Sequence, residues 1–401
     1  EGNFGKSVDI SSDGNTVAIG APSNSGDIFT LPGGCNCVNT RLYESGHVRI
    51  FDWSGSSWNQ LGSDIQGEAK EDFMTNDRNS LSINKNGNVV AIGAARNDSG
   101  NGSNSYDSGH VRIFGLEGSD WVQRGADIDG NNRNDYAGKV SIDDEGDTVA
   151  VGARGDDSNA FNSGLVRIFD LDGNDWVQRG SNIYGEASDD YSGESLSISG
   201  TGDTVAIGSA GNSGSGNRAG HTRIFAWDGS DWAQKGEDID GEEAGDISGW
   251  LTHISKDGNT VIAVSGNKVQ AGSNVNGFFR VFAWDGNNWI KRGSNFELKR
   301  CDSFLESISN NANTVAILQA DDQGSRRQDY NVFLRTYDWD GSDWVQRGGD
   351  IKVPSADVSS SRQVKNVVIS GDGNVISIEN PYSDVNGNGQ TNGSVRIYKW
   401  E

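Results

Sequence analysis

The sequence has 401 residues and a formal net charge of −24, since 57 acidic residues outnumber 33 basic ones. This charge repels phosphate backbones, so we expect no nucleic acid partner, and no apolar run approaches the ~18 residues of a membrane helix, so we expect no membrane insertion. The 12 Trp, 14 Phe and 9 Tyr residues argue against disorder, and the length exceeds the ~250–300 residues at which a single core stops growing, which favours a modular array.

The first expected strands follow one another within residues 4–65. Residues 4–11 and 13–22 read as two strands joined by the turn Asp13-Gly14, because such tight turns need φ > 0, which glycine accepts. After a long loop, residues 46–53 and 58–65 read as a third and a fourth strand. These segments are rich in β-branched and aromatic residues, as strands are.

The same order of strands returns to the end of the chain. An arginine marks the third strand of every copy, at Arg49, Arg112, Arg167, Arg223, Arg280, Arg335 and Arg396. Seven four-stranded copies of about 55 residues are typical of a seven-bladed β-propeller, an all-β fold of antiparallel blades, with a right-handed β-helix as the alternative. We predict a single β-propeller domain over 1–401, with blades at 1–68, 69–130, 131–186, 187–242, 243–298, 299–353 and 354–401.

The final copy stops after its third strand, at Trp400-Glu401. We therefore predict a three-stranded last blade, or a native chain that extends beyond these ends. We expect the ring to close by packing of one blade on the next, without a strand exchanged between the termini.

The tryptophans fall into two columns of the repeat. Six of them open the fourth strand, at Trp58, Trp121, Trp176, Trp232, Trp289 and Trp344. Five more close the third strand, at Trp53, Trp227, Trp284, Trp339 and Trp400. We expect these eleven to pack between blades or across the outer hairpin, and Trp250 is the one that falls outside both columns.

Phe4-Gly5 followed by Gly20-Ala21-Pro22 resembles the FG-GAP repeat, which builds the seven-bladed propeller of integrin α subunits. The repeat of this chain is also similar to repeats of secreted and cell-surface proteins. The resemblance covers nearly the whole chain and implies an extracellular or cell-surface location. Calcium-binding FG-GAP repeats carry Asp-x-Asp-x-Asp-Gly between the first and second strands. Residues 12–15, 85–88 and 144–147 offer too few oxygen ligands for a six- to eight-coordinate ion, so we do not expect calcium there.

Three residues of the last long loop form a candidate metal site. Asp384, Asn386 and Asn388 place oxygen side chains at every second position, as EF-hand loops do, and Ca²⁺ is the ion that such ligands take. No Glu follows at the twelfth position, so a solvated turn is the alternative, and we name no certain cofactor. The three cysteines, Cys35, Cys37 and Cys301, lack the spacing of a zinc site.

Acidic pairs recur in the loops that join blades. They are Glu68 with Asp72, Glu186 with Asp190, and Glu242 with Asp246. Two interpretations are open: side-chain hydrogen bonds that cap strand ends, or metal binding.

Three histidines, His47, His110 and His221, hold the same repeat position in different blades. Equivalent positions on a ring point in rotated directions, so we expect these side chains not to converge on one metal and to belong to the scaffold. With the histidines placed there, no Ser-His-Asp group can be assembled. The sequons at Asn97, Asn101 and Asn392 fall in long loops and are candidate glycosylation sites.

The long loops lie on one face of the predicted ring, and binding residues concentrate on such loops. We therefore predict a non-catalytic extracellular interaction or structural module, part of a larger chain or assembly, whose partners are other extracellular or surface proteins. A carbohydrate-binding propeller is the first alternative and needs exposed aromatics in the long loops, where the sequence offers Phe29, Tyr43, Tyr106, Phe161, Tyr330 and Tyr382. A hydrolase or lyase with an axial site is the second, and it needs polar residues at the starts of the first strands and a carboxyl with a shifted pKa.

Overall fold

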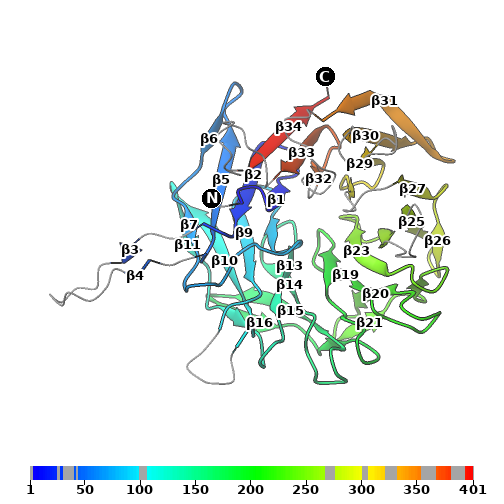
Figure 1. The fold of residues 1–401 in the computed structure, drawn as a ribbon, viewed down its shortest axis with the longest axis horizontal. Helices are drawn as coiled ribbons and strands as arrows, with labels where there is room; N and C mark the ends of the chain where they lie inside the picture. Colours follow the sequence, from blue (N-terminus) through cyan, green and yellow to red (C-terminus); the bar gives the residue numbers. More distant parts are fainter. Residues whose placement is uncertain are drawn as a thin grey trace, which may run out of the picture.

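A computed structural model describes residues 3–24, 28–29, 40–41, 44–98, 106–266, 276–299, 306–320, 332–353, 367–380 and 393–400. The described residues form a seven-bladed β-propeller, in which antiparallel blades surround a central axis (Figure 1). The predicted fold class is confirmed. In the described ranges we find no α-helix, and hence no helix of the length and apolarity that crossing a membrane requires.

The first four blades share one strand order. Blade 1 comprises β1 (Ser7–Ile10), β2 (Thr16–Ala21), β5 (His47–Trp53), β6 (Trp58–Gln60) and β7 (Ile65–Gln66); blade 2 comprises β8 (Leu81–Ile83), β9 (Val89–Ala94), β10 (His110–Glu117), β11 (Asp120–Gln123) and β12 (Ile128–Asp129). Blade 3 comprises β13 (Ala137–Ile142), β14 (Thr148–Ala153), β15 (Leu165–Asp172), β16 (Asp175–Gln178) and β17 (Ile183–Tyr184); blade 4 comprises β18 (Ser195–Ile198), β19 (Thr204–Ser209), β20 (His221–Trp227), β21 (Trp232–Gln234) and β22 (Ile239–Asp240).

Blade 5 keeps this order, and blades 6 and 7 vary it. Blade 5 comprises β23 (Ser248–Ile254), β24 (Thr260–Ser265), β25 (Asn276–Trp284), β26 (Trp289–Lys291) and β27 (Phe296–Lys299); blade 6 comprises β28 (Glu306–Ile308), β29 (Thr314–Ala320), β30 (Val332–Trp339) and β31 (Trp344–Lys352). Blade 7 comprises β32 (Val367–Ile369), β33 (Val375–Asn380) and β34 (Ser394–Lys399), and β3 (Ile28–Phe29) pairs with β4 (Thr40–Arg41) in a separate hairpin.

A short turn joins the first and second strands of each blade. In blade 1, Asp13 Oδ1 accepts hydrogen bonds from the Ser11 hydroxyl (2.7 Å) and the Asn15 backbone N–H (3.0 Å), while Oδ2 accepts one from the Asn15 side chain (2.9 Å). The two bonds to Oδ1 are also made by Ser255, Asp257 and Asn259 and by Ser370, Asp372 and Asn374. Because these carboxylate oxygens bond within their own turns, the turns do not fit the calcium loops of FG-GAP repeats.

The outer strand of blades 1 to 5 is broken into two short pieces. In blade 1, β6 pairs with the end of β5 and β7 pairs with its start, and residues 61–64 bulge between the two pieces. In blade 6 the outer strand β31 is continuous over nine residues, with one register shift between Leu334 and Thr336 of its partner β30.

The hydrophobic core lies between blades. Val48 and Ile50 of blade 1 pack with Leu81 and Ile92 of blade 2 in one buried cluster. Equivalent clusters join the later blades, so each blade buries its two apolar faces against its neighbours.

The tryptophan that opens each outer strand fastens its blade to the preceding one. Trp121 Nε1 donates a hydrogen bond of 2.8 Å to the carbonyl oxygen of Leu61, which lies in the bulge of blade 1. The equivalent bonds, of 2.7–3.1 Å, run from Trp176 to Arg124, Trp232 to Arg179, Trp289 to Lys235 and Trp344 to Arg292. Where the third strand ends in a second tryptophan, the two rings lie tilted against each other, with centroids 5.4 Å apart for Trp53 and Trp58.

We expect Trp289→Phe to lower the free energy of unfolding by about 1–2 kcal/mol, because phenylalanine keeps most of the apolar contact and leaves the Lys235 carbonyl without its donor. Urea unfolding measures the change. Trp284→Phe is the control, since Trp284 lies 5.2 Å from Trp289 and is not the donor of this bond. Equal losses in the two variants would show that packing alone holds this position.

A ring of hydrogen bonds also runs around the axis. At the middle of the first strand of blades 1, 2, 3, 4 and 6, a side-chain oxygen accepts a bond from a backbone N–H of the next blade. The pairs are Ser82 with Ile142 (3.2 Å), Ser141 with Ile198 (3.0 Å), Ser197 with Ile254 (3.1 Å) and Ser307 with Ile369 (3.3 Å).

Asp9 joins blade 1 to blade 2 in the same way, and it also satisfies a backbone N–H of its own strand that blade 7 leaves without an acceptor. The equivalent residue of blade 7 is Val368, whose side chain has no acceptor for the N–H of Ile10. Asp9 Oδ1 accepts that bond at 2.8 Å, while Oδ2 accepts the N–H of Ile83 at 2.8 Å. A carboxylate can satisfy both donors, whereas the single hydroxyl of the equivalent serines serves one.

The ring closes by packing of the first blade on the last. Figure 1 places β1 beside β32 and β33, with the N-terminal strands in blue and the C-terminal strands in red. Val8, Ile10, Val17 and Ile19 are buried in one cluster with Val375. Among the described residues the last blade has three strands and no strand crosses from one end of the chain to the other, as predicted.

Glycines of the second strands allow neighbouring blades to approach closely. A Cβ added at Gly208 would lie 2.0 Å from the carbonyl oxygen of Gly249, and one added at Gly93 would lie 2.0 Å from that of Gly138. These glycines belong to the repeated Ala-Ile-Gly segment, so this part of the repeat is explained by contact between blades.

Candidate functional site

A depression opens where the axis meets the starts of the first strands. It lies on the face that carries two kinds of loop: those between the second and third strands, and those that join one blade to the next. The two kinds of loop hydrogen-bond to each other; for example, the Asp189 N–H donates to the Phe161 carbonyl oxygen at 2.8 Å. We call this the loop face. The depression has a volume of about 260 Å³ and is lined by Lys6, Asn76, Asp77, Arg78, Lys139, Glu194, Trp250 and Leu251.

Trp250 presents its side chain at this depression. It is 38 % exposed, and it is the only one of the twelve tryptophans, all of them described, that lies in an exposed position. A bulge produces this exposure: the pairing of β23 with β24 shifts between Ser248 and Leu251, and Gly249 takes a φ of +80°. The tryptophan outside both sequence columns is therefore the one that faces solvent.

The charged residues around Trp250 are partly paired. Lys139 is 3 % exposed, donates a hydrogen bond of 3.0 Å to the Arg78 carbonyl and lies 3.4 Å from Glu194. Arg154 Nε lies 3.0 Å from the other oxygen of Glu194. Three cationic and two acidic side chains line the depression, so its formal charge is 3 − 2 = +1 on a chain of −24.

The axis itself holds a cavity of about 160 Å³ between the first strands. Burial raises the pKa of Asp9 in its wall to about 6 and lowers the pKa of His253 to about 4. Polar residues at first-strand starts and a carboxyl with a shifted pKa are the two features that the axial-enzyme alternative needs. Both oxygens of Asp9, however, accept backbone hydrogen bonds, one from Ile10 of the same strand and one from Ile83 of the next blade.

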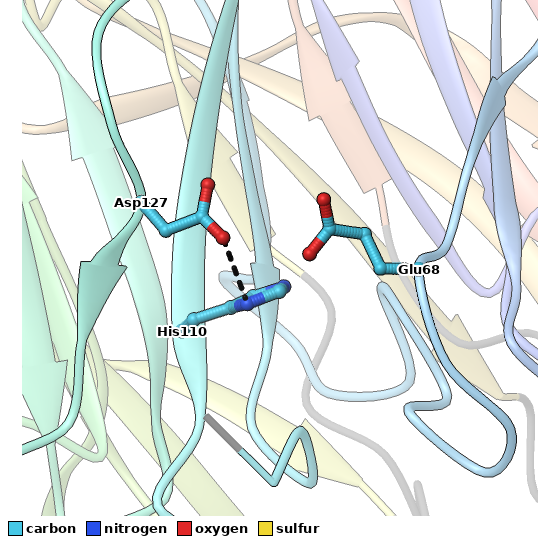
Figure 2. Close-up of side chains that lie close together, drawn as sticks. All are labelled: Glu68, His110 and Asp127. Carbon is cyan, nitrogen blue, oxygen red and sulfur yellow. Dashed lines mark ion pairs between the residues drawn. The ribbon is translucent and has the colours of Figure 1, made fainter. Parts of the chain in front are cut away.

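Two groups of a glutamate, a histidine and an aspartate lie between blades. One consists of Glu68, His110 and Asp127 (Figure 2) and the other of Glu186, His221 and Asp238; in each, one ligand atom from every residue lies within 4.8 Å of the others. We call them the interblade triads. His110 Nδ1 lies 3.6 Å from Asp127 Oδ2, and His221 Nδ1 lies 3.3 Å from Asp238 Oδ2. Burial, reinforced by Arg112, lowers the pKa of His110 to about 4, so its imidazole is neutral at pH 7.

The sequence predicted that these histidines lie in separate blades, but it did not predict the glutamate and the aspartate that lie beside each of them. A spacing was available as a signal, because Asp127 follows His110 by 17 residues (127 − 110) and Asp238 follows His221 by 17 (238 − 221). The glutamate comes from the loop of the preceding blade, and no spacing within one repeat shows which loop residue meets the histidine.

The two acidic residues of each pair in the blade-joining loops make different contacts. Asp72 accepts a hydrogen bond from the Ala69 backbone N–H (2.7 Å), and Asp190 and Asp246 accept equivalent bonds. Glu68 instead reaches the next blade, where Arg112 Nη1 lies 3.2 Å from its carboxylate. The aspartate therefore caps its loop, as one of the two interpretations proposed, while the glutamate joins a neighbouring blade.

Most of the other residues singled out by sequence fall outside the described residues. These are the metal candidates Asp384, Asn386 and Asn388 and the glycosylation candidates Asn101 and Asn392. Asn97 is described, is 6 % exposed and has a side-chain hydrogen bond to Asp72. A glycan on Asn97 would require its amide to leave this contact, and its glycosylation stays a prediction.

No model of a protein family matches the chain, and no curated protein matches it. Solved structures match along nearly the whole ring. Hydrazine synthase of Kuenenia stuttgartiensis is 13 % identical, with a TM-score of 0.56 and coverage of 100 % of this chain and 96 % of that one. The Cps50 (Swd1) β-propeller domain of Myceliophteria thermophila is 10 % identical, with a TM-score of 0.54 and coverage of 98 % and 96 %.

A provisionally assigned 6-phosphogluconolactonase of Bacteroides fragilis is 12 % identical, with a TM-score of 0.51 and coverage of 87 % of this chain and 84 % of that one. These low identities show the fold alone. The chain is therefore a β-propeller whose structural neighbours include enzymes as well as a propeller domain, and its resemblance to FG-GAP repeats stays a prediction.

Proposed function

We propose that this chain is a non-catalytic interaction module of the extracellular space or cell surface, similar to FG-GAP propellers. It binds other extracellular or surface proteins through the loop face, over the depression around Trp250. The observation that carries the proposal is the exposure of this tryptophan, because the other eleven pack into the scaffold. Exposed tryptophans in a polar surround are favoured anchors of binding surfaces.

The local charge indicates the kind of partner. The depression has three cationic side chains on a strongly acidic chain, so it is the part of the loop face that attracts acidic groups. A partner with an acidic surface would meet Lys6 and Arg78 beside the indole of Trp250, while Glu194 holds Lys139 in place.

The test compares the tagged wild-type chain with Trp250→Ala in chemical cross-linking on intact source cells. We expect recovery of the cross-linked surface proteins to fall at least about tenfold, because removing a central aromatic anchor costs about 2 kcal/mol or more. Tyr184→Ala is the matched control, since Tyr184 is 37 % exposed and lies on the outer strand β17. Equal recovery by wild type and Trp250→Ala would refute the proposal.

A carbohydrate ligand is the second candidate for the same face. Tyr106 is 58 % exposed and Phe161 is 64 % exposed, and both come from loops that the sequence offered for sugar stacking. Binding to an array of neutral and acidic oligosaccharides that is lost in Phe161→Ala or Trp250→Ala would favour this candidate over a protein partner. An array without a bound glycan would remove it.

We do not assign a catalytic site to the axis. Asp9 uses both oxygens in backbone hydrogen bonds, and Lys256 lies 3.0 Å from Asp144 at the far end of the cavity. These ionisable groups of the cavity wall are explained by contacts that hold blades together.

A further inference from the structure

The two interblade triads repeat one arrangement at two blade junctions. In each, the histidine opens the third strand, the aspartate follows the outer strand of the same blade, and the glutamate comes from the loop of the preceding blade. Figure 2 shows Asp127 and Glu68 directed toward the His110 imidazole from two sides. The scaffold thus builds the same three-residue group twice.

The histidine and aspartate positions change together in two blades. In blade 3, where the histidine is replaced by Leu165, the aspartate is replaced by Asn182 and the glutamate by Asn131. In blade 5, Phe278 and Asn295 replace the histidine and the aspartate, while the glutamate, Glu242, is kept and lies 3.4 Å from Arg280. Blade 6 keeps an aspartate without a histidine, and there Arg335 holds both oxygens of Asp350. Joint replacement is expected of residues that share one ligand.

The separation in the first triad fits a metal ion better than a hydrogen bond, while the 3.3 Å of the second is compatible with either. The 3.6 Å between His110 Nδ1 and Asp127 Oδ2 is longer than a hydrogen bond. Bonds of about 2.0–2.2 Å around a tetrahedral ion place neighbouring ligand atoms about 3.3–3.6 Å apart, and the two triads show 3.6 and 3.3 Å. Gln123 and Gln234 each hold the other aspartate oxygen at 2.7 Å, which aims Oδ2 at the imidazole.

The histidines of both triads are buried. His110 is 2 % exposed and His221 is 1 % exposed. The carboxyls of Glu68 and Asp127 also face each other, with oxygens that lie within 4.8 Å. Arg112 Nη1 contacts one oxygen of Glu68, so a cation between the two acids would relieve their mutual repulsion.

We propose that each interblade triad binds one divalent transition-metal ion of the Zn²⁺ class. The ligands are one imidazole nitrogen and one oxygen from each carboxylate, with water completing the coordination shell. The ion joins blade 1 to blade 2 through the first triad and blade 3 to blade 4 through the second. This inference does not depend on the function proposed for the loop face.

The test measures bound zinc in the 401-residue chain with all three cysteines replaced by serine, so that thiolates contribute nothing. After removal of metal with EDTA, the protein is dialysed against micromolar Zn²⁺ and its zinc is counted by mass spectrometry. We expect two ions in this parent, one in His110→Leu or His221→Leu, and none in the double variant. Leucine is chosen because Leu165 fills the equivalent position of blade 3, where it is buried.

His47→Leu is the matched control and should keep two ions. His47 occupies the same repeat position, but Arg49 holds both oxygens of Asp64. Co²⁺ in place of Zn²⁺ gives a second readout, a visible absorption band of four-coordinate nitrogen and oxygen ligands. Glu68→Gln should weaken binding at the first triad at least about tenfold, within the range expected when a metal site loses an interacting group, and should leave the second unchanged.

Two results would overturn the proposal. One is a parent chain that retains no zinc at micromolar concentration. The other is zinc that persists at two ions in the folded double variant, as checked by circular dichroism, which would place the metal elsewhere.

Discussion

Replacing Gly208 by alanine will lower the free energy of unfolding by about 3 kcal/mol. The added methyl group would lie 2.0 Å from the Gly249 carbonyl oxygen, which belongs to the backbone of the next blade and cannot swing aside as a side-chain tip can. The backbone of Gly208 does not have a positive φ, so the expected loss comes from this clash and not from strain at the residue itself. Urea unfolding followed by tryptophan fluorescence measures it.

Gly349→Ala is the matched control. Gly349 also lies within a strand, β31, but a Cβ there would meet nothing within 4 Å. We expect this variant to change stability by less than about 0.5 kcal/mol, as most surface substitutions do. If Gly208→Ala were equally harmless, the blades would be free to separate at this junction, and close approach would not explain the glycine of the repeat.

Replacing Asp9 by serine will remove one of its two acceptor oxygens, leaving the N–H of Ile10 without a partner. An unsatisfied buried donor costs about 1–3 kcal/mol. Adding Val368→Ser should recover this amount, because a serine in blade 7 supplies the acceptor that Ser307 and its equivalents supply elsewhere. Val368→Ser alone should bring no gain, since Asp9 already bonds Ile10.

A double-mutant cycle on positions 9 and 368 therefore should show a coupling of about 1–3 kcal/mol. The measurement is urea unfolding of the four proteins at one pH. Additive effects would mean that these two positions do not share a donor, and that the ring closes through the apolar contacts of blades 1 and 7 alone.

The pH dependence of stability gives a separate test of Asp9. Burial raises its pKa to about 6 from an unfolded value of 3.8, so the folded chain binds more protons than the unfolded chain between about pH 4 and pH 6. Stability from this group is therefore present at low pH and falls as pH rises through this window, by up to about 3 kcal/mol. The Asp9→Ser variant should lack this fall, and an unchanged pH profile would contradict the assignment.

The sequence predicted the ring well because each repeat carries its own strand and turn signals. Asp13-Gly14 predicted a turn that the structure forms, and the end of the chain at the seventh third strand predicted the three-stranded blade. These are local features, and the repeat presents each of them several times.

The candidate sites were harder to predict because they join residues of different blades. Trp250 stood out from the tryptophan columns, but its exposure depends on a bulge at Gly249 that no residue spacing revealed. Glu68 was paired by sequence with Asp72, whereas in space it lies beside His110 of the next blade. The offset between one blade's loop and the next blade's strand is set by packing around the ring, and a linear pattern does not record it.

The broken outer strands have a consequence for self-association. A free strand edge is a template on which a second chain can pair and start an aggregate, and short or interrupted edges prevent this. In blades 1 to 5 the outer pieces are two to four residues long, although Val122, Val177 and Ile290 are exposed on them. The continuous β31, with Val345 exposed on it, and β34, the six-residue edge of the three-stranded blade, are the places where edge-to-edge pairing of two copies would begin.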